Sequence, residues 1–319
     1  MIPPSWLIKK ENLVSSSNRR KLGEGTFGVV RLCHYMDPKN GGQQIDVAVK
    51  EICHRVTNRC EEKHEAFVDR VVRELTLLIV ADTRYSVRGY GGYFQSSGQA
   101  EIIMEVMELG NLADYLQVYG EGMRNFHRVQ LCLHCLRLLE YLQKGLKVVH
   151  GDASPTNLLV SRNGRVKLSD FGLCRSLTGT GDFIPTGSGT SRTWQRRYYH
   201  LNTKAGTADA DLSVDQFSFC FIFLRILFGH RSPMFQHAQL HKSINVRTGV
   251  EILGDKARSF LNLVQTSLVT ESVLDLQKLR RAMSEIDYGG NMNSFLTETK
   301  RSLELSEQDV FNYTGGVLN

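Results

Sequence analysis

Residues 150–172 read HGDASPTNLLVSRNGRVKLSDFG, a stretch that carries three side chains of the kinds that phosphoryl transfer requires. That reaction needs a carboxylate to orient the attacking hydroxyl group and oxygen ligands for a magnesium ion that bridges the phosphates. Asp152, Asn157 and Asp170 supply these groups. Each of them alone is typical of an ordinary turn, but their occurrence together and in this order predicts a phosphotransfer site.

A short β-ribbon is expected between the two polar parts of this stretch. Leu158–Val160 and Val166–Leu168 are apolar runs of strand length, and Asn163 with Gly164 is a strong signal for a tight turn between them. The polar residues are therefore expected on either side of a two-stranded ribbon.

A glycine-rich segment with the sequence LGEGTFGVV lies much earlier, at residues 22–30. Glycines allow a β-turn to close over phosphates, because backbone N–H groups then approach the oxygens without a side-chain clash. In this interpretation Gly23, Gly25 and Gly28 cradle the phosphates and Val30 covers the base. The same pattern is also typical of a glycine-rich hairpin that binds nothing.

An alternating strand, VAVK at residues 47–50, ends in a lysine whose point charge is suited to meet phosphates. The segment at about residues 61–80 is expected to be a helix, and Glu74 lies on its apolar stripe. A carboxylate on a buried face needs a cationic partner, because leaving it unpaired costs several kcal/mol. We therefore pair Lys50 with Glu74 rather than with Glu65, which lies further back along the helix.

Together these motifs resemble those of the eukaryotic-type protein kinase superfamily over about residues 20–285, in the order glycine-rich loop, VAVK, helix glutamate, H-x-D-x-x-x-x-N and DFG. The resemblance implies an α+β, two-lobed protein kinase fold, with a small antiparallel β-sheet lobe that carries one helix and a larger, mainly helical lobe. The expected parts are an N-terminal extension (1–19), an N-lobe (20–107), a C-lobe (108–285) and a C-terminal tail (286–319). Residues 1 to about 18 are polar and are expected to be peripheral, and glycine-rich turns are expected at residues 41–42 and 89–92.

The resemblance also implies a serine/threonine-type protein kinase that uses ATP and Mg²⁺ to phosphorylate protein substrates. The catalytic residues would be Lys50, Glu74, Asp152 and Asn157, and the metal ligands would be Asn157 and Asp170. The residues expected to bind the nucleotide are Leu22, Gly23, Gly25, Gly28, Val30, Ala48, Lys50, Glu105, Met107, Asn111 and Leu159.

Supporting roles follow from the same resemblance. Asp215, in an apolar segment near residues 213–228, resembles the buried aspartate that holds the catalytic loop. Met104 would be the gatekeeper residue before Glu105 and Met107, whose backbones would bind adenine. A packed column of the active state would consist of Leu78, His150 and Phe171.

The sequence departs from the family pattern at three places. Gly151 stands where the family has an arginine, so the cation that binds a phosphate on the activation segment is missing. Ser154 replaces a lysine that helps to neutralise the γ-phosphate. The Ala-Pro-Glu motif is absent after residues 189–190, and the stretch 270–275 lacks the arginine that pairs with its glutamate. These departures indicate a divergent kinase whose activity does not depend on phosphorylation of the loop.

Two other classes of function stay open at this point. A pseudokinase-like scaffold would bind nucleotide weakly and act as an interaction module, although the catalytic set is complete. A small-molecule phosphotransferase is suggested by the sequence HGD followed closely by serine, which also resembles RIO-type atypical kinases and aminoglycoside kinases. Cys132 and Cys135 with His134 would be a candidate zinc site, but the lack of a second pair favours core packing of an amphipathic helix.

Composition excludes several classes of protein. The 319 residues contain 41% hydrophobic and 23% charged side chains, as ordinary globular chains do, and the formal charge of +6 does not favour nucleic-acid binding. Seven scattered cysteines and an N-terminus unlike a signal peptide favour an intracellular, cytoplasmic protein. The most apolar run, Phe217–Phe228, is shorter than the roughly 20 residues needed to span a bilayer, so the segment near residues 213–228 is interpreted as a buried helix.

A protein substrate is the partner that this interpretation implies. Arg192, Arg196 and Arg197 belong to the segment that docks substrates in the family. Because clustered arginines favour negatively charged groups, an acidic or already phosphorylated substrate is expected; the alternative is that these arginines form only a solvated face.

Overall fold

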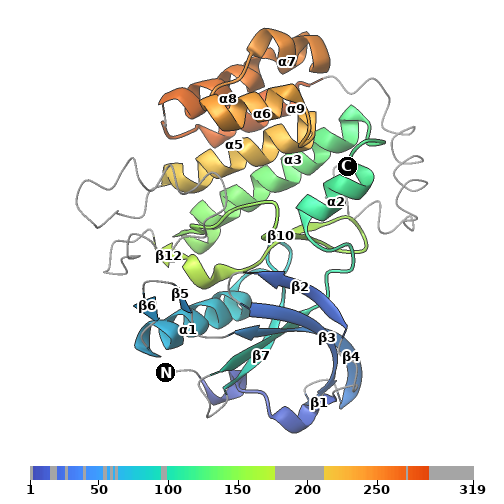
Figure 1. Cartoon of the computed structure of the whole chain (residues 1–319), viewed down its shortest axis with the longest axis vertical. Coiled ribbons are helices and arrows are strands. Elements are labelled where there is room, and N and C mark those ends of the chain that lie inside the picture. Colours follow the sequence, from blue (N-terminus) through green and yellow to red (C-terminus); the bar gives the residue numbers. More distant parts are fainter. Residues whose placement is uncertain are drawn as a thin grey trace. The chain divides into compact units, whose positions relative to one another are not determined.

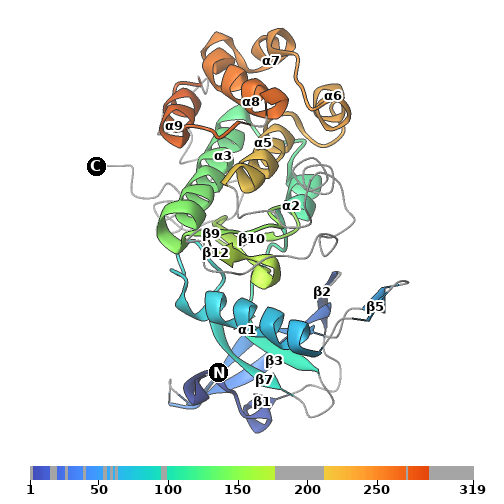
Figure 2. The ribbon, with the colours of Figure 1, turned by 90° about the vertical axis from the view of Figure 1, so that its left-hand side faces the viewer.

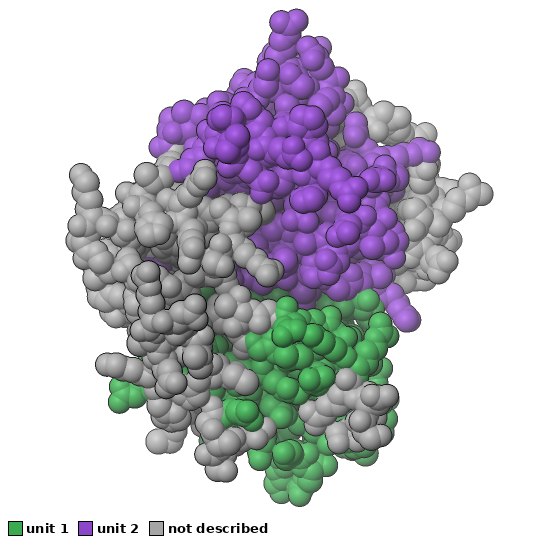
Figure 3. Space-filling view, in the orientation of Figure 1, with its two compact units in different colours: residues 1–108, 169–174 green, residues 109–168, 175–319 purple. Residues whose placement is uncertain are grey.

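The computed structural model divides the chain into two compact units (Figure 3). Unit 1 comprises residues 1–108 and 169–174, and unit 2 comprises residues 109–168 and 175–319. The structure describes residues 3–14, 20–25, 28–38, 41–52, 56–57, 60–61, 64–94, 99–176, 212–270 and 272–286. Unit 1 is built on a β-sheet and unit 2 mainly on helices, so the predicted two-lobed α+β class is confirmed. The segment 169–174 clusters with unit 1, whereas the sequence prediction counted it with the C-lobe.

Unit 1 consists of an antiparallel sheet and the helix that packs on it (Figure 1). The strands of the sheet are β1 (Leu13–Val14), β2 (Lys21–Gly25), β3 (Gly28–Asp37), β4 (Gln43–Ile52), β7 (Gly89–Phe94) and β8 (Ala100–Glu105), and a separate small hairpin contains β5 (Val56–Thr57) and β6 (Cys60–Glu61). The helical segments are α1 (His64–Val80), η1 (Pro4–Trp6), η2 (Lys10–Asn12) and η5 (Phe171–Leu173). The strand order is β1-β3-β4-β8-β7, and β2 also pairs with β3.

Strand β4 lies inside the sheet, between β3 and β8, and its two faces have different neighbours. Val47 and Val49 are fully buried in a core cluster that includes Cys33 and Ile103. Because successive side chains of a strand point to opposite faces, Lys50 lies on the other face, where α1 packs against β7 and β8. The alternation in VAVK thus places a lysine next to a helix.

Two sequence predictions about unit 1 are wrong. Residues 1–18 were expected to be peripheral, but Ile8 and Leu13 are buried in the core cluster, and the N–H of Ile8 donates to the carbonyl of Gly92. Residues 89–92 were expected to be a turn, but they belong to β7. A Cβ at Gly91 or Gly92 would approach Ile8 or Leu75 to 3.0 Å or less, so glycines are needed there for close packing rather than for chain reversal.

Unit 2 contains most of the helices and two short β-ribbons (Figures 1 and 2). Its helices are α2 (Leu112–Tyr119), α3 (Asn125–Glu140), the π-helix η4 (Tyr141–Leu146), α5 (Leu212–Phe228), α6 (Pro233–His241), α7 (Val246–Leu253), η6 (Asp255–Ala257), α8 (Arg258–Thr270) and α9 (Leu276–Ser284). Its strands are β9 (Val148–Val149) paired with β12 (Arg175–Ser176), and β10 (Leu158–Val160) paired with β11 (Val166–Leu168).

Helices α3 and α5 run side by side and form the centre of unit 2 (Figures 1 and 2). Almost every residue of α5 from Ser213 to Leu227 is buried, as expected for a helix that is apolar on all sides. Helices α6 and α8 pack against α5, and α9 packs against α3. The predicted buried helix near residues 213–228 is therefore confirmed.

The predicted ribbon of β10 and β11 is also present. Leu158 pairs with Leu168 and Val160 with Val166, and Gly164 has a positive φ of 72° in the turn between them. Along the chain, the ribbon lies between residues 150–157 and the DFG segment, as the sequence indicated.

Several predictions lie outside the described residues. They concern the absence of the Ala-Pro-Glu motif, the arginines Arg192, Arg196 and Arg197, and the tail from residue 287 onward. Within the described part of the chain, no helix combines the length and the apolar character needed to cross a bilayer.

Candidate active-site residues

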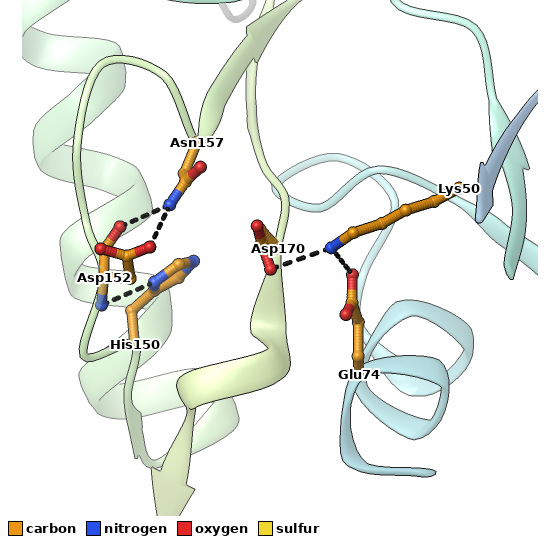
Figure 4. Close-up of polar contacts among 6 residues, drawn as sticks. All are labelled: Lys50, Glu74, His150, Asp152, Asn157 and Asp170. Carbon is orange, nitrogen blue, oxygen red and sulfur yellow. Dashed lines mark hydrogen bonds and ion pairs between the residues drawn. The ribbon is translucent and has the colours of Figure 1, made fainter. Parts of the chain in front are cut away.

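In unit 1, Lys50, Glu74 and Asp170 form a buried polar cluster, here called the lysine triad (Figure 4). The Nζ of Lys50 donates to Oε1 of Glu74 at 2.6 Å and to Oδ1 of Asp170 at 3.0 Å. The side chain of Lys50 is 8% exposed, that of Glu74 is 1% exposed and that of Asp170 is 20% exposed. The predicted pairing of Lys50 with Glu74 is confirmed, whereas Glu65 lies exposed in the first turn of α1.

Three different elements of unit 1 supply the triad. Lys50 lies in β4, opposite Val30 of β3, and Glu74 lies on the buried face of α1. Asp170 precedes η5 with a positive φ of 59°, an uncommon conformation for a residue with a side chain. A Cβ at Gly172 would lie 3.3 Å from Oε2 of Glu74, so this glycine lets the DFG segment pack closely on α1.

The charges of the triad depend on one another. Burial alone would lower the pKa of Lys50, but the carboxylates of Asp170 and Glu74 outweigh it and raise that pKa above its usual value. Burial raises the pKa of Glu74, and Lys50 opposes this effect. Lys50 is therefore a cation held inside the protein by two carboxylates, with a geometry suited to binding anionic groups.

The glycine-rich segment forms the β2–β3 hairpin. Gly23 pairs with Val30, and Gly25 pairs with Gly28. Gly28 has a positive φ of 147°, and a Cβ there would overlap the backbone of Glu51 in β4. Glycine at position 28 is thus required by strand packing, and this requirement exists whether or not the hairpin also covers phosphates.

The residues predicted to surround the base fall into both units. In unit 1, Ala48 is buried and pairs with Met104, and Leu22 is 41% exposed on β2. The N–H of Glu105 donates to the carbonyl of Arg88 at 3.0 Å, so a contact with adenine at Glu105 cannot use that N–H. Met107 follows β8 and is 9% exposed.

In unit 2, Asn111 and Leu159 form an isolated β-bridge. Asn111 caps α2: its Oδ1 accepts from the N–H of Asp114 at 2.9 Å, and its Nδ2 donates to Oδ2 of Asp114 at 2.7 Å. A contact of the Asn111 side chain with the nucleotide, as predicted from the sequence, would compete with this cap.

The loop 150–157 of unit 2 brings together its predicted functional side chains (Figure 4). The Nδ2 of Asn157 donates to the backbone oxygen of Asp152 at 2.8 Å and to its Oδ2 at 2.9 Å. The N–H of Asp152 donates to Nδ1 of His150 at 3.3 Å. Because the amide nitrogen of Asn157 faces Asp152, its amide oxygen points away, as a metal ligand would.

Asp215 at the start of α5 anchors this loop. Its carboxylate accepts from the N–H of His150 at 2.6 Å and from the N–H of Gly151 at 3.1 Å. Burial raises the pKa of Asp215, whereas His150, the two N–H groups and Arg175 act in the opposite direction. The predicted role of Asp215 as the anchor of the loop is confirmed by these bonds. Gly151 has a positive φ of 74°, which favours glycine at the position where the family has arginine.

Comparison with known families agrees with this geometry. The family model described as protein tyrosine and serine/threonine kinase matches residues 17–253. The chain belongs to the protein tyrosine and serine/threonine kinase family. The kinase match includes the glycine-rich hairpin, the lysine triad, the loop 150–157 and all of α5.

A curated relative of this kinase is mitogen-activated protein kinase kinase 1 of Arabidopsis thaliana. The two chains are 32% identical over 120 residues, which is 38% of this chain and 33% of the relative. The chain therefore aligns with about a third of the length of that relative.

Three polar residues that support the kinase machinery were not singled out for these roles from the sequence. Arg70, 4% exposed, lies one turn before Glu74 on α1, stacks over Phe67 at 5.5 Å and opposes the rise in the pKa of Glu74. Arg175, 5% exposed, is paired with Val149 in the ribbon beside the loop 150–157. Gln216 binds the backbone of Leu274. The i,i+4 spacing of Arg70 and Glu74 on a helix is a local pattern that could have indicated the role of Arg70. Arg175 and Gln216 contact segments that are distant in the sequence, so no local pattern indicates their roles.

Proposed function

We propose that this chain is an active protein kinase that transfers the γ-phosphate of ATP to serine or threonine hydroxyl groups of proteins, with Mg²⁺. The observation that carries the proposal is the lysine triad, in which a buried, charged Lys50 contacts both Glu74 and Asp170. Keeping Lys50 and Glu74 buried is costly unless they are paired, and the clustering of such groups with the partly exposed Asp170 is typical of functional sites.

Lys50 would supply a fixed positive charge to the α- and β-phosphates. Its flexible side chain is held by Oε1 of Glu74 at 2.6 Å, so the ammonium group is oriented before nucleotide binds. The role of Glu74 is thus to position Lys50 rather than to touch the substrate.

Asp152 would orient the attacking hydroxyl group and accept its proton. The carboxylate is held by Nδ2 of Asn157, and the loop that carries it is fixed to α5 through Asp215. Two independent restraints on one short loop reduce the freedom of Asp152, as positioning catalysis requires.

Asp170 and Asn157 fit a magnesium ion in the chemistry of their donor atoms. Mg²⁺ prefers oxygen ligands and is commonly held by one or two carboxylates together with substrate phosphates. Asp170 offers a carboxylate and Asn157 an amide oxygen. When bound, the ion would neutralise charge on the phosphates.

The choice of serine or threonine as acceptor, and of an acidic or already phosphorylated substrate, belongs to this proposal. The family description covers both tyrosine and serine/threonine kinases, and the Arabidopsis relative is a kinase of another protein kinase. Arg192, Arg196 and Arg197 would provide the positive charge for such a substrate.

The test is incubation of the purified chain with ATP and Mg²⁺, with a basic and an acidic protein as acceptors. Phosphorylated residues are identified by mass spectrometry, and Asp152→Ala is compared with Asp255→Ala, a change at an exposed aspartate. We expect phosphoserine or phosphothreonine with the wild type and Asp255→Ala, but not with Asp152→Ala.

The competing functions give different results when the same experiment is run first with the protein acceptors and then with metabolite acceptors. A scaffold would give no phosphate on any acceptor, and a small-molecule kinase would consume ATP only when metabolite acceptors are added. Either result would overturn the proposal.

A further inference from the structure

Helix α6 of unit 2 carries two histidines one helical turn apart, His237 and His241. Both side chains are exposed. Their ring centroids are 4.4 Å apart, with 39° between the ring planes. Neither residue belongs to the proposed phosphotransfer site.

The helix holds the two rings on one face. Side chains at positions i and i+4 lie above one another on a helix surface. Ser232 caps the N-terminus by accepting from the N–H of Phe235 at 3.1 Å, and Lys242 ends the helix in a left-handed conformation. Met234, Phe235 and Ala238 of the same helix are buried in unit 2, where α6 packs against α5. The pair is therefore a surface feature on a well-anchored helix.

Two imidazoles at this separation have the chemistry of a chelating pair. Neutral imidazole nitrogens bind zinc at about 2.0–2.1 Å and also suit copper and nickel. To share an ion, one ring nitrogen of His237 and one of His241 need to come within about 4 Å of one another. Rings whose centroids are 4.4 Å apart allow this by small side-chain rotations. His241 also lies in the last turn of α6, where the exposed carbonyl groups favour a positive charge.

We propose that His237 and His241 bind one transition-metal cation as a two-histidine surface site. In the described part of the chain, no group of three or more His, Cys, Asp and Glu residues is placed to hold a metal. The site is accordingly open, with water completing the coordination shell. The Irving–Williams order predicts tightest binding for Cu²⁺, and Mg²⁺ does not compete because it prefers oxygen ligands.

The test is titration of the full chain with Cu²⁺ and with Ni²⁺, followed by calorimetry and, for Cu²⁺, by electron paramagnetic resonance. The variants are His237→Asn, His241→Asn and the double variant, with His230→Asn as the matched control in the loop before α6. Because the chain has ten histidines, the comparison is of stoichiometry between variants. Circular dichroism and kinase activity check that each variant is folded.

We expect the double variant to lose one equivalent of bound metal and the two-nitrogen signature of Cu²⁺. Each single variant should bind that equivalent at least about tenfold more weakly, and excess Mg²⁺ should leave the wild-type titration unchanged. The proposal is overturned if the double variant keeps the stoichiometry and affinity of the wild type, or if His230→Asn has the same effect as the pair.

Discussion

Lys50 remains charged inside the protein because two carboxylates contact its ammonium group. Moving an isolated ammonium ion out of water costs several kcal/mol, and the contacts of 2.6 and 3.0 Å with Glu74 and Asp170 offset that cost. Removing the charge of Lys50 therefore leaves two carboxylates without their cationic partner. Neutralising Glu74 has a smaller effect, because Lys50 stays paired with Asp170.

Lys50→Met should therefore harm phosphate transfer more than Glu74→Gln. We expect a loss of about hundredfold or more for Lys50→Met, or ~2.7 kcal/mol of barrier, because the charge that meets the phosphates is absent. Glutamine at position 74 can still accept a hydrogen bond from Lys50, so the expected loss is nearer to tenfold. The measurement is the initial rate at saturating ATP.

The control for this comparison is Lys9→Met, since the side chain of Lys9 is 79% exposed. Wild-type activity in Lys50→Met would remove the proposed role of Lys50, and a larger loss in Glu74→Gln would contradict the ranking.

At the scale of elements, the N-terminal turn of α5 holds two distant segments through buried side chains. Asp215 binds the backbone of the loop 150–157, and Gln216 binds the backbone of Leu274 in the segment before α9. The N–H of Leu274 donates to Oε1 of Gln216 at 2.6 Å, and Nε2 of Gln216 donates to the carbonyl of Leu274 at 3.4 Å. The neutral amide of Gln216 thus holds Leu274 in place. Leu274 belongs to the stretch 270–275, in which the sequence lacks the family arginine.

Gln216→Leu should lower the free energy of unfolding by about 1–3 kcal/mol, because it leaves the buried backbone groups of Leu274 without their partner. Chemical denaturation at neutral pH measures the change. Gln143→Leu is the matched control: Gln143 accepts a 3.4 Å bond from Gln216 and donates a 3.5 Å bond to the carbonyl of Leu212, and since both bonds are long, the loss of stability should be smaller. Equal stability of Gln216→Leu and the wild type would contradict the anchoring role.

Helix α9 depends on a charged cap. Asp275 accepts from the N–H of Lys278 and of Gln277, and these bonds hold the pKa of Asp275 below its usual value. A carboxyl group with a lowered folded-state pKa stabilises the fold above its ordinary pKa, and this contribution is lost as the pH falls through the lower value.

Asp275→Ala should therefore have a lower melting temperature than the wild type at neutral pH, and the difference should narrow below about pH 3.9. Asp275→Asn keeps an oxygen that can cap the helix, so its stability relative to Asp275→Ala should vary less with pH. Thermal unfolding followed by circular dichroism at several pH values gives the comparison. If the difference in melting temperature between Asp275→Ala and the wild type widened as the pH falls, the charged carboxylate of Asp275 would not be what stabilises the helix.

At the scale of the whole molecule, the kinase lacks the usual receiver for an activating phosphate. Gly151 replaces the family arginine, and the nearby described cation Arg175 is 5% exposed and already acts on the charge of Asp215. In the sequence, Arg192, Arg196 and Arg197 also belong to the segment between Asp170 and Tyr199.

We expect the unphosphorylated protein to be active as made. Phosphatase treatment should change its initial rate by less than about tenfold, which corresponds to ~1.4 kcal/mol of barrier. Mass spectrometry before and after treatment gives the phosphate stoichiometry. A hundredfold fall in rate on dephosphorylation would contradict the prediction and assign the receiver role to one of the remaining arginines.

Residue types and their spacing, with the family resemblance that they carry, predicted the fold class, the order of the motifs and the chemistry of the candidate site. The alternation in VAVK, the apolar stripe of α1 and the Asn163-Gly164 turn are local patterns, and local geometry alone decides which side chains share a face. The apolar character of α5 likewise indicated its burial. Glu74 was recognised as the partner of Lys50 because a buried carboxylate requires a cation.

The contacts between distant groups, and the glycines that serve packing rather than a turn, became visible only in the folded chain. Asp170 reaches Lys50 from 120 residues away, and Gln216 binds Leu274 from 58 residues away. The strand at Gly89–Phe94 was mispredicted as a turn, because its glycines serve close packing against residues from elsewhere in the chain. The burial of Ile8 was missed for the same reason, since Ile8 is one of the residues that pack against Gly91. Residue type and spacing describe local preference, whereas burial and long-range pairing depend on the free energy of the whole packed unit.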